Sequence, residues 1–348
     1  MESASSLLSP VVAVPVRNEA DRLPVLLEAL ARQTWLGLPG RRLGVVFVLN
    51  NCVDDSAEVL EAGAADHPNL CLEVLEVEFP PPHAHVGWAR RVAMERACTK
   101  AGRGAVLFST DADAAPAVDW IDASLRAVNA GADLVGGHII GNKAEEALLG
   151  VGFVHRAMRH LYYAMLADHL ASLLDSVPHD PWPRHSDHTG ASLAVRGDVY
   201  AAVGGIPPLS FREDIAFVAK AVAAGYRLRH PLDVKVSVSA RLDGRARGGM
   251  ADCLRTWMAA EAAGLPHLVV GPRSISSRLA LRRRKRAKRM GHALGLAPTQ
   301  TYRQELWLRK ISEDTVGPEH EVANTEIESA IKQIQQMVAD GESAILVP

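Results

Sequence analysis

Between residues 11 and 140 the chain repeats one pattern: an apolar run, a polar loop, and a stretch whose apolar residues recur at helical spacing. In the first such stretch Leu23, Leu26 and Leu30 lie at positions i, i+3 and i+7, which is typical of a helix that covers a sheet. The apolar runs, rich in Val, Leu or Ile, are predicted as strands at 11–16, 44–49, 70–77, 104–109 and 133–140. This alternation predicts an α/β fold with a mostly parallel sheet covered by helices on both faces.

After residue 140 the pattern becomes mixed. The further elements that we expect are one or two helices within 143–175, a loop at 176–189, a strand at 191–195, a helix at 213–224 and a strand at 234–238. Beyond Gly244 the sequence is strongly charged and helical, and one more strand is expected at 344–347.

These changes predict the organisation of the chain. We expect an N-terminal tail at 1–10, a main domain at 11–243 and a helical, basic C-terminal extension at 244–348. The main domain is expected to have two halves, at 11–140 and 141–243, for which the family resemblance given below implies nucleotide binding and acceptor binding, respectively.

Composition and charge exclude several classes of protein. With 48% hydrophobic and 22% charged residues, the chain resembles an ordinary folded protein and not a disordered one. A formal net charge of −2 gives no global attraction to nucleic acid, so we expect no such partner. The four cysteines form no C-x-x-C pair, residues 1–10 lack the basic and apolar regions typical of a signal peptide, and no apolar run is long enough to span a bilayer. We therefore expect a cytoplasmic protein.

Two carboxylates follow the strand at 104–109. Asp111 and Asp113 are two positions apart, so on an extended segment both side chains would point to the same side. Paired carboxylates suit Mg²⁺ or Mn²⁺ that also binds a diphosphate. A D-x-D pattern occurs by chance about once in a chain of this length, so its position at a strand end, where such sheets bind ligands, carries the prediction. The alternative is an aspartate that caps the helix after Ala117.

Polar loops also follow the first two strands. The first contains Pro15-Val-Arg-Asn-Glu19 and the second Asn50-Asn51-Cys52-Val53. Both could bind the edge of a nucleobase or cap the next helix. Neither has the glycine pattern of a dinucleotide site or a P-loop.

Four segments together resemble glycosyltransferase family 2. They are the loop at 15–19 with its leucine-rich helix, Asp111-Ala112-Asp113, the segment 190–196, and Phe211-Arg-Glu213-Asp214, in this order. The similarity covers about residues 10–240. It implies a GT-A fold, a nucleotide-sugar donor, a divalent cation (Mg²⁺ or Mn²⁺) on Asp111 and Asp113, and inverting transfer to an acceptor hydroxyl.

The resemblance also implies roles for individual residues. Asp214 is expected to be the catalytic base, with Glu213 beside it; in isolation such a pair is more often a favourable charge at a helix start. The residues implied in nucleotide binding are Pro15, Arg17, Glu19, Asn50, Asn51, Gly87, Arg91, Asp111 and Ala112. The residues expected to bind the acceptor are Trp182, His188, Gly190 and Ala191.

The chain also departs from the family. Relatives carry adjacent aspartates where this chain has Asn50 and Asn51, although an amide can still pair with a base edge. Relatives often carry a histidine after the last strand of this domain, whereas here the sequence reads Val238-Ser-Ala-Arg241. No third metal ligand is therefore assigned. Arg90 and Arg91 are candidates for a phosphate, with two solvated arginines as the alternative.

Two further segments are unusual. The loop at 179–188 contains several histidines and aspartates, but their spacing is not that of a zinc site, so we expect an acceptor pocket or a lid there rather than a second metal. Residues 278–289 contain eight basic side chains, which could dock an anionic membrane surface at its inner face or pair with acidic neighbours.

The sequence leaves two alternative functions open. A sugar-phosphate nucleotidyltransferase shares the sheet and the metal carboxylates, but it needs a glycine-rich loop after the first strand, and residues 17–21 contain no glycine. A non-catalytic protein that binds nucleotides or polyanions through its basic segment is the other alternative.

Overall fold

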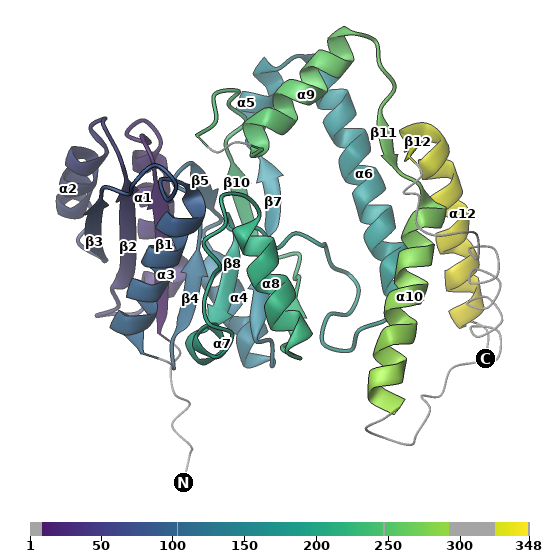
Figure 1. Cartoon of the computed structure of the whole chain (residues 1–348), viewed down its shortest axis with the longest axis horizontal. Helices are drawn as coiled ribbons and strands as arrows, with labels where there is room; N and C mark the ends of the chain where they lie inside the picture. The colour runs from purple at the N-terminus through teal and green to yellow at the C-terminus, as the bar shows by residue number, and fades with distance from the viewer. Residues whose placement is uncertain (1–8, 103, 246–247, 292–323, 347–348) are drawn as a thin grey trace. The chain divides into compact units, whose positions relative to one another are not determined.

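The computed structural model describes residues 9–102, 104–245, 248–291 and 324–346 (Figure 1). The chain folds into two compact units. Unit 1 comprises Met1–Leu148 and His185–Arg255, and unit 2 comprises Leu149–Arg184 and Thr256–Pro348. The sequence predicts a boundary at 243/244, whereas these units group residues 149–184 with the C-terminal part of the chain.

Unit 1 is built around a seven-stranded sheet in the order β3-β2-β1-β4-β8-β6-β9. All neighbouring strands pair in parallel except β8, which is antiparallel to both of its neighbours. The strands are β1 (Pro10–Val16), β2 (Leu43–Asn50), β3 (Leu70–Val77), β4 (Val106–Ser109), β6 (Leu134–Gly136), β8 (Leu193–Arg196) and β9 (Leu228–Arg229). The mostly parallel sheet that the sequence predicts is confirmed.

Helices cover both faces of this sheet, as β1 illustrates. Val12, Val14 and Val16 belong to one hydrophobic cluster with the leucines of α1. Val11 and Ala13 belong to a second cluster with apolar residues of α3. Because successive side chains of a strand point to opposite faces, β1 is apolar at every position. The helices of unit 1 are α1 (Leu23–Ala31), η1 (Thr34–Gly37), α2 (Ser56–Asp66), α3 (Val86–Ala101), α4 (Trp120–Asn129), α5 (Lys143–Leu148), α7 (Gly197–Ala202) and α8 (Glu213–Ala223).

A smaller sheet in unit 1 corrects one predicted strand. The run at 133–140 is divided between β6 of the large sheet and β7 (His138–Gly141) of a three-stranded sheet with β5 (Ala114–Pro116) and β10 (Lys235–Val238). The division falls at Gly137, where a Cβ atom would lie 1.9 Å from the Ser192 Oγ. Only glycine allows this close approach, so the chain leaves one sheet and enters the next at this residue.

Unit 2 contains the helices α6 (Val151–Leu174), α10 (Pro272–Gly291) and α12 (Ile327–Leu346), whose apolar residues form a third hydrophobic cluster. Helix α9 (Met250–Ala262) spans the division between the units. The strand expected at 344–347 is wrong, because residues 344–346 continue α12, and residue 347 lies outside the described residues. Two short strands that the sequence pattern does not predict, β11 (Leu268–Val270) and β12 (Asn324–Glu326), pair in unit 2. None of the helices described is both long enough and apolar enough to cross a membrane.

Residues 278–289 of the basic segment lie on α10. Arg282 forms an ion pair with the buried Asp175 of the same unit at 3.3 Å. For residues 285–291 the structure describes the helix but not the side chains. Docking of this segment to a membrane stays a prediction.

Candidate active site

Three loops of unit 1 hold a non-glycine residue in the left-handed region. Asn18 follows β1 with φ 54°, Asn51 follows β2 with φ 50°, and Arg212 precedes α8 with φ 56°. Asparagine tolerates this conformation better than most residues, whereas arginine does not. Such strain persists only where surrounding contacts hold the backbone in place. The Val53 N–H donates to Asn18 Oδ1 at 2.8 Å, which joins the first two of these loops.

Arg90 of α3 connects the D-x-D segment with the start of α8. Its guanidinium donates to Glu213 Oε1 at 2.9 Å and to Asp111 Oδ1 at 2.7 Å. It also donates to Ser109 Oγ at 2.8 Å and to the Gly190 carbonyl at 3.0 Å. Burial alone would lower the pKa of this group, but Asp111 and Glu213 raise it, so Arg90 stays charged. Residues from four separate segments therefore meet at one buried cation.

Asp214 lies in the first turn of α8, next to Glu213. Its Oδ2 accepts a hydrogen bond from the Gly190 N–H at 2.5 Å, and its Oδ1 accepts one from the Ile215 N–H at 2.7 Å. A Cβ atom at Gly190 would lie 2.3 Å from Arg90 Cζ, so the glycine is required by the close approach of the arginine. The Gly190 backbone binds both Asp214 and Arg90, so it holds the Asp214 carboxylate near the arginine that binds Asp111.

Asp113 lies among carboxylates and one arginine. Arg241 forms an ion pair with Asp113 Oδ2 at 3.0 Å and a two-pronged ion pair with the buried Glu19. Burial, together with the negative charges of Asp111 and Glu19, raises the pKa of Asp113 to about 6, although Arg241 opposes this shift. Four carboxylates, those of Glu19, Asp111, Asp113 and Glu213, pair with only two arginines, Arg90 and Arg241, so this group carries an excess of formal negative charge. This excess, on hard oxygen donors, fits a divalent cation of the Mg²⁺ or Mn²⁺ type.

The backbone of the D-x-D segment differs from the extended segment that the sequence predicts. Residues 112 and 113 form a turn in which the Ala114 N–H donates to the Asp111 carbonyl at 3.2 Å. Ala112 is buried, while the side chains of Asp111 and Asp113 are 35% and 26% exposed. The turn, and not the alternation of a strand, brings the two carboxylates together.

A cavity of about 690 Å³ lies at the carboxyl ends of β1, β2 and β3. It is lined by Arg17, Asn51, Glu78, Phe79, Pro80, Pro81 and Ala84. Arg17 donates to the Ala84 carbonyl at 2.5 Å, and this contact ties the loop after β1 to the loop after β3. Nothing in the sequence of residues 78–84 predicts a binding role, because the three consecutive prolines of this segment indicate only a connecting loop.

Several residues expected at the nucleotide have other contacts. Asn51 uses its amide to pair with both backbone groups of Phe79, at 3.0 and 3.1 Å, as a neighbouring strand would. Arg91 donates to the Ile206 carbonyl at 2.9 Å and pairs with Glu95 on its own helix. A Cβ atom at Gly87 would lie 1.9 Å from the Leu209 carbonyl oxygen, so this glycine is required for packing against protein backbone.

Pro15 and Asn50 lie at the ends of β1 and β2, and both are buried. Among the described residues, Asn50 Oδ1 has no hydrogen-bond partner.

The residues expected at the acceptor fall into both units. Gly190 and Ala191 lie beside the D-x-D segment, where the Ala191 carbonyl accepts a hydrogen bond from Thr110 Oγ1 at 2.9 Å. His188 pairs with His230, their ring nitrogens being 3.2 Å apart. Trp182 belongs to unit 2, where its ring stacks on His169 with centroids 4.2 Å apart.

Two arginines take places that the sequence does not predict. Arg90 lies on the apolar stripe of α3 that Ala93, Met94 and Ala97 define, a spacing that would have predicted its burial. Arg241 follows β10, where the resemblance leads us to expect a histidine. Its partner Glu19 is 222 positions away, so no local pattern could have indicated the pair.

Comparisons with known proteins agree with the motifs. Residues 11–163 match the model of glycosyl transferase family 2. No curated protein matches the chain. Among solved structures, the chain is similar to the mannosyltransferase PcManGT from Pyrobaculum calidifontis in complex with GDP-Man and Mn²⁺ (16% identity, 96% of this chain and 85% of that one, TM-score 0.47). It is also similar to residues 1–349 of TarS from S. aureus in complex with UDP (15% identity, 97% and 90%, TM-score 0.48).

The matched residues include the loop at 15–19 and the D-x-D segment, two of the four segments that carry the resemblance in the sequence. The predicted resemblance is thus confirmed for this part of the chain: residues 11–163 match glycosyl transferase family 2.

Proposed function

We propose that this glycosyl transferase moves a sugar from a nucleotide-diphosphate sugar to an acceptor hydroxyl. The observation that carries the proposal is the network around Arg90, which binds Asp111 on one side and Glu213 on the other. Gly190 contacts both Arg90 and Asp214 in this network. The carboxylates proposed to hold the cation for the sugar donor, and the proposed base for the acceptor hydroxyl, are thus available at one place.

The nucleobase is assigned to the cavity lined by Arg17, Asn51 and the segment 78–84. Open sheets of this kind bind nucleotides at the carboxyl ends of their strands, and this cavity lies at the ends of three of them. Its volume of about 690 Å³ is within the range of ordinary ligand pockets. Arg17 brings a positive charge to its wall, next to the backbone of Phe79 and Pro80.

Asp111 and Asp113 would hold the divalent cation. When bound, this cation supplies positive charge to the diphosphate that leaves the anomeric carbon. Burial and the neighbouring carboxylates, which together raise the pKa of Asp113, support this assignment. Arg241, which pairs with Asp113 and Glu19, is proposed to keep both carboxylates in place in the absence of a histidine ligand.

Asp214 is proposed to be the base. It takes the proton of the acceptor hydroxyl while the hydroxyl oxygen forms a bond to the anomeric carbon and the bond to the diphosphate breaks. Attack from the face opposite the leaving group inverts that carbon. The two backbone N–H groups that bind its oxygens orient the carboxylate for this role. Glu213 binds Arg90 and is proposed to fix the start of α8.

Thermal shift experiments test the donor site. UDP or GDP should raise the Tm of the full chain more strongly with Mn²⁺ than without it, and Asp113→Ala should remove the part that depends on the metal. If the Tm responds to polyanions alone and salt abolishes the response, the chain is a binding protein and the proposal is wrong.

Asp214→Asn tests the base. We expect transfer to fall by roughly 10²–10⁴-fold while nucleotide affinity stays near that of the wild type. An equal loss of transfer and of nucleotide affinity would instead place Asp214 in the donor site or in the structural framework.

A further inference from the structure

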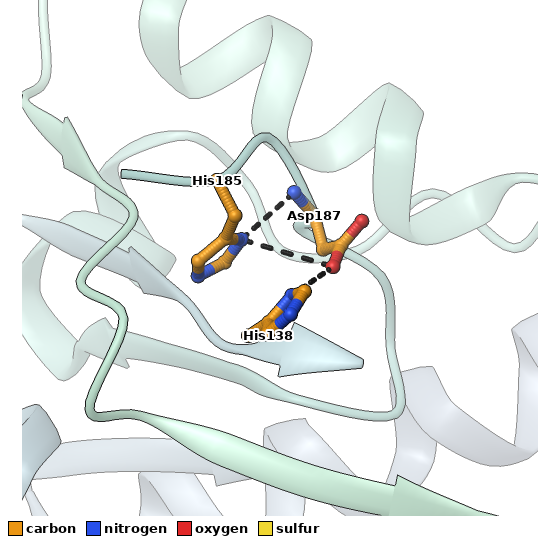
Figure 2. Close-up of side chains that lie close together, drawn as sticks. All are labelled: His138, His185 and Asp187. Carbon is orange, nitrogen blue, oxygen red and sulfur yellow. Dashed lines mark hydrogen bonds and ion pairs between the residues drawn. The ribbon is translucent and has the colours of Figure 1, made fainter. Parts of the chain in front are cut away.

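A second group of possible metal ligands lies in unit 1, away from the D-x-D segment in the sequence. His138 is the first residue of β7, and His185 and Asp187 lie in the loop that precedes β8. His188 of this loop and His230 after β9 are close by. Figure 2 shows the rings of His138 and His185 next to the Asp187 carboxylate, with dashed lines from both rings to one of its oxygens. His138, His185 and Asp187 have no part in the proposed transfer.

The distances within this group match those of a metal site. His138 Nδ1 lies 2.9 Å from Asp187 Oδ2, and His185 Nδ1 lies 3.8 Å from the same oxygen. Ligand atoms of all three residues lie within 4.8 Å of one another. In a tetrahedral zinc site with bonds of about 2.0–2.1 Å, the ligand atoms are about 3.4 Å apart. The two measured distances bracket this value, so small side-chain movements would complete the geometry.

His185 supplies an independent indication of a ligand. The residue is only 4% exposed, and within the described part of the chain its Nε2 has no hydrogen-bond partner. Its Nδ1 accepts a hydrogen bond from the Asp187 N–H at 3.0 Å. Because Nδ1 accepts this hydrogen bond, a neutral ring carries its proton on Nε2. Either nitrogen becomes a ligand only when the hydrogen bond is given up: Nδ1 then offers its lone pair, or takes the proton and frees that of Nε2.

We propose that His138, His185 and Asp187 bind a transition-metal ion of the Zn²⁺ type. Two imidazoles and one carboxylate suit Zn²⁺, whereas Mg²⁺ and Mn²⁺ prefer sites built from oxygen ligands. Three protein ligands leave the fourth position of a tetrahedral site for water. This site is separate from Asp111 and Asp113, which offer oxygen ligands only.

The bound ion would position the loop that reaches the active site. Asp187 already accepts a hydrogen bond from the Ile139 N–H at 3.0 Å, and its carbonyl would lie 2.3 Å from a Cβ atom at Gly136. Three residues further on, the Gly190 N–H binds Asp214. An ion shared by β7 and this loop therefore fixes the segment that orients the proposed base. The three ligands of the ion are thus positioning residues.

Metal analysis of the full chain tests the proposal. The protein is stripped with a chelator, titrated with ZnCl₂ at pH 7.5 and analysed by calorimetry and by elemental analysis after gel filtration. We expect one Zn²⁺ per chain, a higher Tm, and a visible spectrum typical of tetrahedral Co²⁺ when CoCl₂ replaces ZnCl₂. Failure of the stripped wild-type chain to bind Zn²⁺ stoichiometrically overturns the proposal, and the histidines then form a hydrogen-bonded cluster only.

Variants assign the ligands. Asp187→Asn and His138→Gln should each weaken Zn²⁺ binding by at least roughly 10–100-fold. Asp113→Ala and the remote His67→Gln should leave Zn²⁺ binding unchanged. A stoichiometric Zn²⁺ that persists in both ligand variants, or that is lost in Asp113→Ala, contradicts this site. The Asp113→Ala variant also distinguishes the proposed Zn²⁺ site from the proposed transfer activity, because this substitution affects only the cation that binds the sugar donor.

Discussion

Replacing Arg90 by methionine should destabilise unit 1 strongly. Methionine fills much of the space of arginine but carries no charge and donates no hydrogen bond. Glu213, whose side chain is only 5% exposed, then keeps a buried charge without its cation. Asp111 loses the same partner but is 35% exposed, so water compensates part of its loss.

The magnitude follows from these contacts. Removing one partner of a buried ion pair costs about 3–5 kcal/mol, mostly because the other charge is stranded. The Gly190 carbonyl keeps a hydrogen bond from Ser109 Oγ, so it adds little to the cost. In the double variant with Glu213→Gln the stranded charge is gone, and we expect a coupling energy of about 1–3 kcal/mol between positions 90 and 213.

Hydrogen exchange of the amides in β4 measures this loss, because that strand lies in the centre of the sheet and exchanges only through large openings. Arg91→Met is the matched control. Its side chain is the next arginine on the same helix and is 28% exposed. It pairs with the exposed Glu95 and donates to the Ile206 carbonyl, so its loss should cost about 1–2 kcal/mol. Equal protection of β4 in the two variants would refute the view that Arg90 is the cation on which the site is built.

Three further predictions concern the site and its walls. The pKa of Asp113, raised from 3.8 to about 6, means that its protonation stabilises the metal-free fold below pH 4 and that this contribution is lost as pH rises to 6. Because protons compete with the cation for Asp113, the affinity for Mn²⁺ alone should rise about tenfold from pH 5 to pH 7. Calorimetry measures this affinity, and an affinity that does not change with pH would contradict the prediction. Asp113→Asn should abolish the pH dependence. Gly87→Ala should lower stability by about 1–3 kcal/mol through its clash with Leu209, whereas Gly37→Ala, with no atom within 4 Å, should be neutral in the same thermal melts. Arg17→Ala should weaken UDP or GDP binding by roughly 10–100-fold in calorimetry, and unchanged affinity would place the nucleobase elsewhere.

The sequence predicts the sheet well because its central strands are buried on both faces. β1 is apolar at every position, so its pattern does not depend on which face it presents. The place of the D-x-D segment follows from the end of β4 in the same way. By contrast, the division at Gly137 depends on a contact with Ser192, which lies far away in the sequence.

Parts of the site escape prediction for a related reason. Arg90 has the spacing of a buried residue, but an arginine is so often solvated that the spacing alone does not decide its position. The pair of Arg241 and Glu19 depends entirely on the tertiary fold. Short strands such as β11 and β12, three residues each, carry too few positions for a period to be recognised.

Release of nucleoside diphosphate from nucleotide sugars tests the central claim most directly. A panel of UDP- and GDP-sugars is incubated with the full chain and Mn²⁺ in the absence of acceptor. We predict slow hydrolysis of at least one donor by the wild type and its loss in Asp113→Ala, with the fold of the variant verified by hydrogen exchange. A folded wild type that neither binds nor hydrolyses any of these donors, or hydrolysis that is unchanged in Asp113→Ala, would contradict the assignment of a donor site at Asp111 and Asp113.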